Sequence, residues 1–148
     1  GNSGGALANS LGEVVGINTA VAGIGLGLAV PINDTTRRIV ASLLTEGRVR
    51  RAYLGVAGNP APLPPGLAER VGQSVGLHVV EVVPDGPAAR AGIHEGDVIL
   101  TAAGQAIAGA QALQRLMLAD AIGTRLPITV VRNGALVDVV ATPVELAG

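Results

Sequence analysis

A serine set among glycines opens the printed sequence, in the stretch Gly1-Asn2-Ser3-Gly4-Gly5. Glycines on both sides let the backbone turn tightly and leave a side chain exposed. A serine hydroxyl is nevertheless a weak nucleophile unless a neighbouring base takes its proton. On these five residues alone, a reactive serine and a flexible Gly-Ser segment both remain open interpretations.

The residues after Gly5 help to distinguish between three known types of site in which a serine lies among glycines. A nucleophile elbow needs a helix directly after the serine, whereas the segment after Gly5 is rich in turns and short apolar runs. A phosphate-binding loop needs a lysine before Ser or Thr, and all ten basic residues of the chain are arginine. A trypsin-type loop between β-strands fits the context, and there backbone N–H groups stabilise the developing negative charge.

The elements that must position this serine are predicted to be β-strands followed by one helix. Residues 1–32 indicate β structure, with short apolar runs around 14–17 and 26–32 separated by glycines. Asn33 is a good helix N-cap, and Gly47 is a plausible residue to end that helix. Arg48-Val49-Arg50-Arg51 is a polar connector, which makes it the candidate domain boundary.

The second half predicts a small strand-rich barrel or sandwich with helices. Asn133-Gly134 between two alternating runs is a strong hairpin signal. The stretch 58–66 holds four prolines and is predicted to be a loop. Strands are expected at 53–56, 76–83, 98–102, 125–132 and 135–142, and helices at 67–71, from Pro87 to near Gly92 and at 110–121.

Composition excludes several classes of function. The net charge of -1 and the single aromatic residue argue against a nucleic-acid partner. The absence of cysteine excludes disulfides, thiolate catalysis and cysteine-zinc sites. No apolar run reaches the roughly 18 residues that a membrane-spanning helix needs. We expect no metal and no cofactor.

Several longer runs resemble the HtrA/Deg family of trypsin-fold serine proteases. They are G-N-S-G-G-A-L-A-N-S-L-G-E-V-V-G-I-N-T, G-I-G-L-G-L-A-V-P-I-N and R-R-A-Y-L-G-V. The run G-L-H-V-V-E-V-V-P-D-G-P-A-A-R-A-G-I-H-E-G-D-V-I-L resembles the PDZ domain of that family. The resemblance implies a mostly β fold with α-helices: the C-terminal part of a trypsin-like β-barrel protease domain at 1–47, then a PDZ domain with its connector at 48–146.

The resemblance also implies roles for residues in the first part. Ser3 matches the nucleophile, and Gly1 with Ser3 would supply the oxyanion-hole N–H groups. Ile17, Asn18 and Thr19 match the strand along which the substrate backbone lies, and Leu26 matches a wall of the specificity pocket. The family order is His, Asp, Ser, so the base and the acid are expected upstream of Gly1. His78 and His94 are more simply explained as surface or strand residues, so this chain alone is expected to be inactive.

In the PDZ part, the resemblance implies a groove that holds a peptide C-terminus as an added strand. Tyr53-Leu54-Gly55-Val56 matches the carboxylate-binding loop, and Arg51 or Arg50 could add positive charge. The groove would lie between the strand at 56–58 and the helix at 110–121. Candidates for its apolar pocket are Leu113, Leu116 and Met117, of which one or two are expected to be ordinary core.

These inferences together predict an exported serine endopeptidase of HtrA/Deg type for protein quality control, in the bacterial envelope or periplasm. Its expected partners are unfolded proteins and apolar peptide C-termini, with a homotrimer implied for the intact protein. A rival interpretation is a PDZ adaptor that carries a catalytically dead protease remnant. A chaperone without proteolysis is a third, and it would share the PDZ half.

Overall fold

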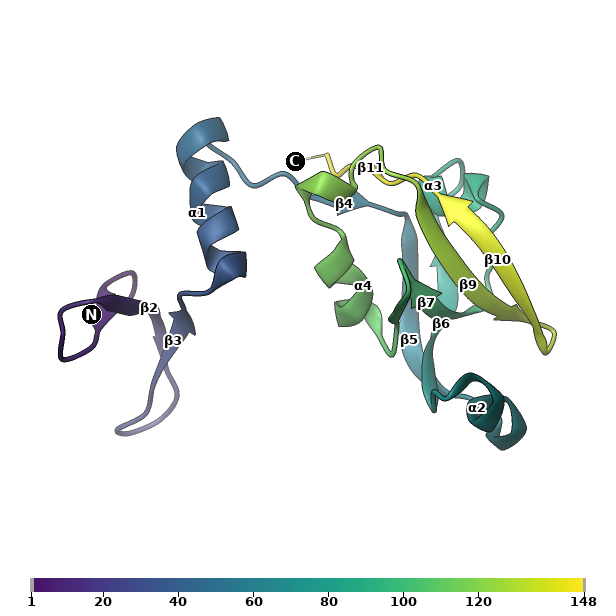
Figure 1. The fold of residues 1–148 in the computed structure, drawn as a ribbon, viewed down its shortest axis with the longest axis horizontal. Helices are drawn as coiled ribbons and strands as arrows, with labels where there is room; N and C mark the ends of the chain where they lie inside the picture. Colours follow the sequence, from purple (N-terminus) through teal and green to yellow (C-terminus); the bar gives the residue numbers. More distant parts are fainter. Residues whose placement is uncertain (1, 148) are drawn as a thin grey trace. The chain divides into compact units, whose positions relative to one another are not determined.

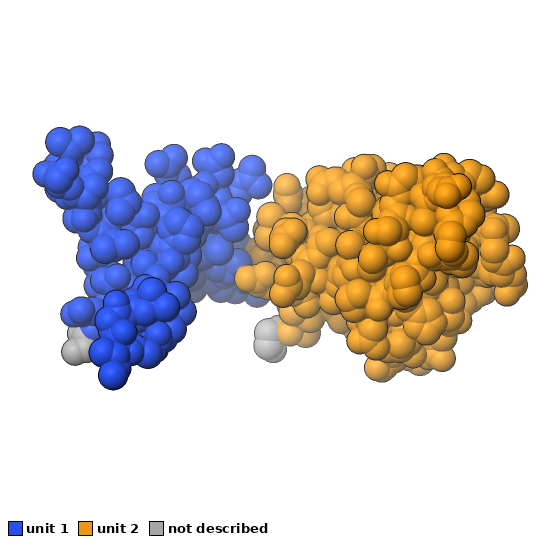
Figure 2. Space-filling view, turned by 90° about the horizontal axis from the view of Figure 1, so that it is seen from below, with its two compact units in different colours: residues 1–49 blue, residues 50–148 orange. Residues whose placement is uncertain are grey.

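The chain divides into two compact units in the computed structural model, which describes residues 2–147 (Figure 2). Unit 1 is Gly1–Val49 and unit 2 is Arg50–Gly148. Each unit is built from its own hydrogen-bonded sheets. None of the helices within residues 2–147 is long and apolar enough to cross a membrane.

Unit 1 is a three-stranded antiparallel sheet followed by one helix (Figure 1). The strand order is β1-β2-β3, so β2 is central. The pairing of β2 with β3 shifts register between Asn18 and Ala20. The elements are β1 (Ala6–Ala8), β2 (Val14–Val21), β3 (Gly27–Pro31) and α1 (Asp34–Glu46).

Helix α1 has the ends that its sequence predicts. The side chain of Asn33 accepts a hydrogen bond from the N–H of Thr36, and the Thr36 hydroxyl accepts one from the N–H of Asn33. This reciprocal capping satisfies two N–H groups that a helix otherwise leaves unpaired. At the other end, Gly47 has φ +70° and donates to the carbonyl of Leu43. Both predicted caps are therefore confirmed.

Unit 1 has almost no interior of its own. Among residues 2–49 only Gly16 is buried, and α1 buries no residue. The apolar side chains of the sheet and helix are largely exposed, including Leu28 at 48% and Leu43 at 48%. Burial of apolar surface is the main source of folding free energy, so this unit contributes little stability by itself.

Unit 2 contains a six-stranded antiparallel sheet (Figure 1). Its order is β10-β9-β7-β6-β5, with β8 paired to β7, so β5 and β10 are its edge strands. A two-stranded ribbon joins β4 (Ala52–Tyr53) to β11 (Val144–Glu145). The sheet strands are β5 (Val56–Pro62), β6 (Val75–Val82), β7 (Val98–Ala102), β8 (Gln105–Ala106), β9 (Leu126–Arg132) and β10 (Ala135–Ala141).

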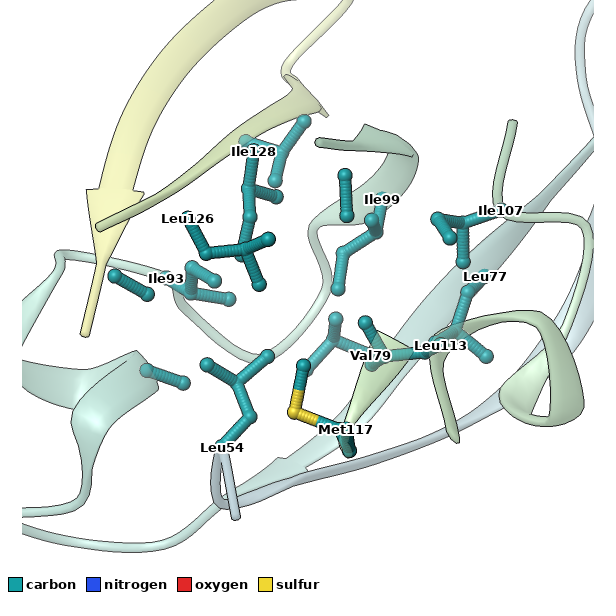
Figure 3. Close-up of a cluster of buried hydrophobic side chains, with 14 of the residues drawn as sticks. Leu54, Leu77, Val79, Ile93, Ile99, Ile107, Leu113, Met117, Leu126 and Ile128 are labelled. Atoms are coloured by element: carbon teal, nitrogen blue, oxygen red, sulfur yellow. The ribbon is translucent and has the colours of Figure 1, made fainter. Parts of the chain in front are cut away.

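Short helices complete unit 2 and cover its aliphatic core. They are α2 (Pro65–Val71), α3 (Pro87–Arg90), α4 (Ala110–Leu116) and the 3-10 turn η1 (Ala119–Ala121). Leu77, Val79, Ile99 and Ile128 are each 1% exposed or less. Figure 3 shows side chains of the sheet, of α4 and of the segment before β5 converging on this core. An aliphatic core with no large aromatic ring is what the composition predicts.

Three predicted elements of unit 2 differ from the structure. The predicted strand at 53–56 is interrupted, because β4 ends at Tyr53 and β5 begins at Val56. The predicted loop at 58–66 is wrong, because 56–62 form β5 and 65–71 form α2. The predicted helix at 110–121 ends at Leu116 and resumes only as η1. It breaks there because the Met117 carbonyl accepts a hydrogen bond from the N–H of Ala52, and Leu118 pairs with Arg51 as a β-bridge. A long-range contact thus overrides a continuous helical pattern.

Candidate functional site

A groove of about 420 Å³ in unit 2 brings together most of the residues predicted for peptide binding. Its two walls are the segment 51–58 and helix α4, which lie side by side in Figure 1. Leu77 and Leu146 complete the lining. The predicted residues in the lining are Arg51, Tyr53, Leu54, Gly55, Val56, Leu113 and Met117.

Gly55 occupies the bend between β4 and β5, at one end of the groove. Its φ is +82°, a backbone conformation that residues with a Cβ adopt only at a cost. A Cβ placed there would also lie 3.4 Å from Cε1 of Tyr53 and 3.4 Å from Cβ of Val83. The position therefore favours glycine for its conformation, whereas a Cβ there would meet its neighbours at ordinary contact distances.

The carbonyl groups of this bend are already engaged on the side away from the groove. The Leu54 carbonyl accepts from the N–H of Ala88, and the Gly55 carbonyl accepts from the N–H of Val83, both at 2.9 Å. In a trans peptide the N–H points opposite to the preceding carbonyl. The N–H group of Gly55 is therefore directed away from Ala88, and that of Val56 is directed away from Val83. Gly55 and Val56 both line the groove. Adjacent N–H groups of this kind form a site for an anion.

The bottom of the groove is apolar and is continuous with the core. Leu54, Leu77, Leu113 and Met117 line it and are each 8% exposed or less. Figure 3 shows Leu54, Leu113 and Met117 in the same cluster of side chains. These residues thus belong to the hydrophobic core and also form the bottom of the groove. Leu116 packs partly buried against the core and is not among the groove residues.

The two arginines considered for the groove differ in position. Arg50 forms an ion pair with Glu145, with Nη2 to Oε2 at 3.2 Å, across the start of the β4–β11 ribbon. Arg51 is exposed and lines the groove. The two arginines are adjacent in the sequence, but only Arg51 lines the groove in the structure.

Leu77, Leu146 and Gln114 are among the groove residues that were not identified from the sequence. Leu77 lies on β6 and Leu146 follows β11, so both reach the groove through long-range pairing. Gln114 lies one residue after Leu113 on the exposed side of α4. Only for Gln114 does the sequence hold a signal, since its helix was already predicted to form one wall.

Ser3 occupies a tight turn in unit 1. The N–H of Gly5 donates to the carbonyl of Asn2 at 2.9 Å, and Gly4 has φ +82°, as at the third position of a type II turn. The turn is fastened to β2 by hydrogen bonds from Gly4 to Asn18 and from Asn18 to Gly5. The Ser3 hydroxyl is exposed and donates to the carbonyl of Thr19 at 3.1 Å.

The other residues predicted for the protease part lie on or beside the same sheet. Ile17, Asn18 and Thr19 are on β2, and the hydroxyl of Thr19 donates to the carbonyl of Leu28. Leu26 lies in the turn before β3, 56% exposed. Gly1 lies outside the described residues. Both N–H and C=O of Asn18 are bonded to the Ser3 turn, so β2 holds that turn in place.

Unit 1 contains no histidine, the usual base for a serine nucleophile. The two histidines of the chain are His78 and His94. Residues 2–147 also hold no cluster of three or more His, Asp or Glu side chains that could bind a metal ion. Within the described part of unit 1, the hydrogen-bond partner of the Ser3 hydroxyl is the carbonyl of Thr19.

Comparison with known families identifies the second unit. The family model of the PDZ domain matches residues 47–142. This range contains the bend at Gly55, the sheet and helix α4.

Comparison with whole proteins extends the similarity over both units. The chain is 36% identical over 144 residues to the periplasmic serine endoprotease DegP of Escherichia coli K12, covering 94% of this chain and 30% of that protein. A solved structure of the HtrA-type protease AlgW with decapeptide is similar over 100% of this chain and 47% of that one, with 35% identity and a TM-score of 0.80. The serine endoprotease from Yersinia pestis gives 36% identity and a TM-score of 0.76, over 99% of this chain and 48% of that one.

The chain thus spans about a third of the length of the curated relative and about half of the solved chains. Over nearly its whole length it is homologous to DegP and HtrA-type serine endoproteases.

Proposed function

The chain belongs to the PDZ domain family, and from this premise we propose that the groove of unit 2 binds the C-terminal residues of peptides and unfolded proteins. The observation that carries this proposal is the pairing of an anion site with an apolar pocket. The N–H groups at Gly55 and Val56 lie at one end of the groove, beside the pocket formed by Leu113 and Met117. A peptide C-terminus presents a carboxylate beside one side chain, which is this same combination of groups.

Each part of the groove has a distinct energetic role in the proposal. The carboxylate accepts hydrogen bonds from backbone N–H groups, and hydrogen bonds to a charged group are stronger than neutral ones. The last side chain enters the apolar pocket, where burial of a Val- or Leu-sized group contributes about 1.5–3 kcal/mol. Arg51 adds a positive charge near the carboxylate. The peptide backbone then pairs with the free edge of β5.

We extend the proposal to unit 1 through the homology with HtrA-type serine endoproteases. In the intact protein, Ser3 is the nucleophile and the N–H groups of Gly1 and Ser3 stabilise the oxyanion. The support is the turn that exposes the Ser3 hydroxyl and its attachment to β2. The exposed apolar surface of the sheet is further support, because a complete protease domain would cover it.

The proposed activity is hydrolysis of misfolded proteins by acyl transfer in the bacterial periplasm. Ile17, Asn18 and Thr19 would lie along the substrate, with Leu26 at the specificity pocket. The base and the acid must come from residues other than those of unit 1, and a homotrimer is part of the proposal. The 148-residue chain alone is expected to be inactive, since Ser3 has no histidine within its unit.

The alternative is a peptide-binding adaptor in which unit 1 performs no chemistry. Labelling of the intact protein with a fluorophosphonate distinguishes the two, because this reagent reacts only with an activated serine. We expect one label on Ser3, and its loss in Ser3→Ala. An unlabelled but folded intact protein would support the adaptor instead.

Peptide capture is tested by fluorescence anisotropy on the whole chain with a labelled peptide that ends in Val-Leu-Val. Its matched control is the same peptide with a C-terminal amide in place of the carboxylate. We expect the free carboxylate to bind and the amide to bind at least about tenfold more weakly. Equal binding of both peptides would contradict the role of the Gly55 bend.

A further inference from the structure

The free edge of β5 offers backbone groups at alternate residues only, and these can be assigned from its partners. Gly58 lies opposite Val79 of β6. Val79 donates its N–H to the carbonyl of Asp97 and accepts from the N–H of Gly96, both at 2.8 Å. Val79 therefore directs both groups away from β5, and Gly58 must direct its own N–H and C=O to the free edge.

The same reasoning places Val56 on the free edge. The Gly55 carbonyl accepts from the N–H of Val83 and so faces β6. The backbone N–H and C=O groups of successive residues in a strand point to opposite edges. The N–H and C=O groups of Val56 therefore face the groove. Val56 and Gly58 thus provide the first donors and acceptors that an added strand would meet.

The next residue in this alternation is Pro60, and it has no N–H to donate. Pro60 lies opposite Leu77, which pairs on its other side with Ile99 of β7. Its free-edge position is where a strand tolerates proline, since no sheet hydrogen bond is lost there. An added strand would therefore find a donor at Gly58 and none two residues later.

The ring of Pro60 also lies just beyond the end of the groove. A Cβ on Gly109, the residue before α4, would lie 3.4 Å from Cγ of Pro60. The ring therefore lies against the start of this helix. The groove itself extends to Gly58 on the strand and to Ala110 on the helix, and neither Pro60 nor Gly109 lines it.

We propose that Pro60 ends the main-chain pairing between this groove and a bound peptide, so that the pairing stops before the fifth residue from the peptide C-terminus. The proposal rests on the proposed peptide-binding function. The N–H of the last residue donates to the Val56 carbonyl, and the third residue from the end exchanges both hydrogen bonds with Gly58. The fifth residue from the end meets Pro60, so its carbonyl has no donor. Residues further upstream leave the groove without contributing specific contacts.

The first test compares peptides of different length on the whole chain. N-acetylated peptides of three, four, five, six and ten residues all end in Val-Leu-Val, with alanine and serine upstream, and their Kd values are measured by competition. We expect all five values to agree within about threefold. A Kd at least about tenfold lower for the peptides of five or more residues would overturn the proposed end of the pairing. If no peptide binds, the proposed function itself fails.

The second test restores the missing donor with Pro60→Ala. A net hydrogen bond is worth about a three- to tenfold change in Kd, so peptides of five or more residues should bind tighter by that factor. The three-residue peptide should be unchanged. Pro127→Ala is the matched control, because Pro127 is an exposed proline on β9 that does not line the groove.

The pattern over length decides what Pro60 does. An equal change for the three- and ten-residue peptides would mean that Pro60 shapes the pocket, which contradicts the proposed end of the pairing. No change for any peptide would also contradict it, provided that thermal unfolding shows Pro60→Ala to be folded.

Discussion

Asp97 and Arg132 form a two-point contact between the loop after α3 and strand β9. Nε of Arg132 donates to Oδ1 of Asp97 at 2.9 Å, and Nη2 donates to Oδ2 at 2.7 Å. Nη2 also donates to the carbonyl of Gly92, and the N–H of His94 donates to Oδ2 of Asp97. Asp97 is only 2% exposed, and its buried carboxylate accepts three hydrogen bonds, two from Arg132 and one from the N–H of His94.

Replacing this carboxylate should destabilise unit 2. Asp97→Asn keeps the size of the side chain but leaves the guanidinium of Arg132 without its anion. Breaking a buried ion pair costs roughly 3–5 kcal/mol, and we expect about 3 kcal/mol because the Arg132 side chain is 28% exposed. The free energy of unfolding in urea measures it. Asp120→Asn, at an exposed position, should change it by less than about 0.5 kcal/mol.

The same contact should make stability depend on pH in the acid range. Burial alone would raise the pKa of Asp97, but the hydrogen bonds and charge of Arg132 and the N–H of His94 outweigh it and lower the pKa. A lowered folded-state pKa stabilises the fold above the unfolded value, and this contribution is lost as the pH falls through the folded value. The difference in unfolding free energy between wild type and Asp97→Asn should therefore shrink below about pH 4. A constant difference from pH 7 to pH 2.5 would contradict this.

Gly55→Ala should impair peptide binding more than it impairs folding. At φ +82° an alanine is strained, and the cost in stability is about 1 kcal/mol or more. The distorted bend should raise the Kd of a peptide ending in Val-Leu-Val at least about tenfold, because the N–H groups proposed to hold the carboxylate turn with it.

Gly123→Ala is the matched control for that change. Gly123 also has a positive φ, of +74°, but a Cβ there meets nothing within 4 Å and the residue does not line the groove. It should lose similar stability while keeping the wild-type Kd. A Kd that rises equally in both variants would show that the effect comes from stability and not from the bend.

Arg51 should contribute to peptide affinity and Arg50 should not. Arg51→Gln removes an exposed charge beside the groove, and exposed charge pairs are worth about 0.2–1 kcal/mol, so a two- to fivefold rise in Kd is expected. The difference from wild type should vanish at high salt. Arg50→Gln, which disturbs the ion pair with Glu145 instead, should leave the Kd unchanged.

The two units should differ in amide hydrogen exchange. The N–H groups of β2 and β3 belong to a sheet whose apolar residues are exposed, whereas those of β6, β7 and β9 lie over a closed core. Exchange follows local opening, which is frequent where little apolar surface is buried. In the 148-residue chain, unit 1 should exchange at least about tenfold faster than the sheet of unit 2. Equal protection in both units would contradict the expectation that the low apolar burial of unit 1 makes it open more often.

Local signals were sufficient for much of the fold. The caps at Asn33 and Gly47 define α1 because a side-chain oxygen and a left-handed glycine act within one turn of chain. Asn133-Gly134 defines the β9–β10 hairpin for the same reason, with both residues at positive φ. The family resemblance, not a local signal, suggested the strand at 56–58 and the helix at 110–121 as the two walls of the groove.

Proline content misled the prediction where tertiary structure decided the outcome. Pro60 and Pro62 suggest a loop, yet they lie in β5, because at a sheet edge the missing N–H costs no hydrogen bond. A strand becomes an edge only through the order in which all strands pair. No local pattern contains that order.

What the sequence by itself determined is the set of elements with short-range signals, the PDZ-like bend at Gly55 and the serine turn at Ser3. Only the tertiary structure decided that Arg51 and not Arg50 lies at the groove, that Leu77 and Leu146 complete it, and that Leu116 packs against the core instead. The physical reason is the range of the forces involved. Caps and turns depend on neighbours along the chain, whereas a groove depends on surfaces brought together by pairing between strands far apart in sequence.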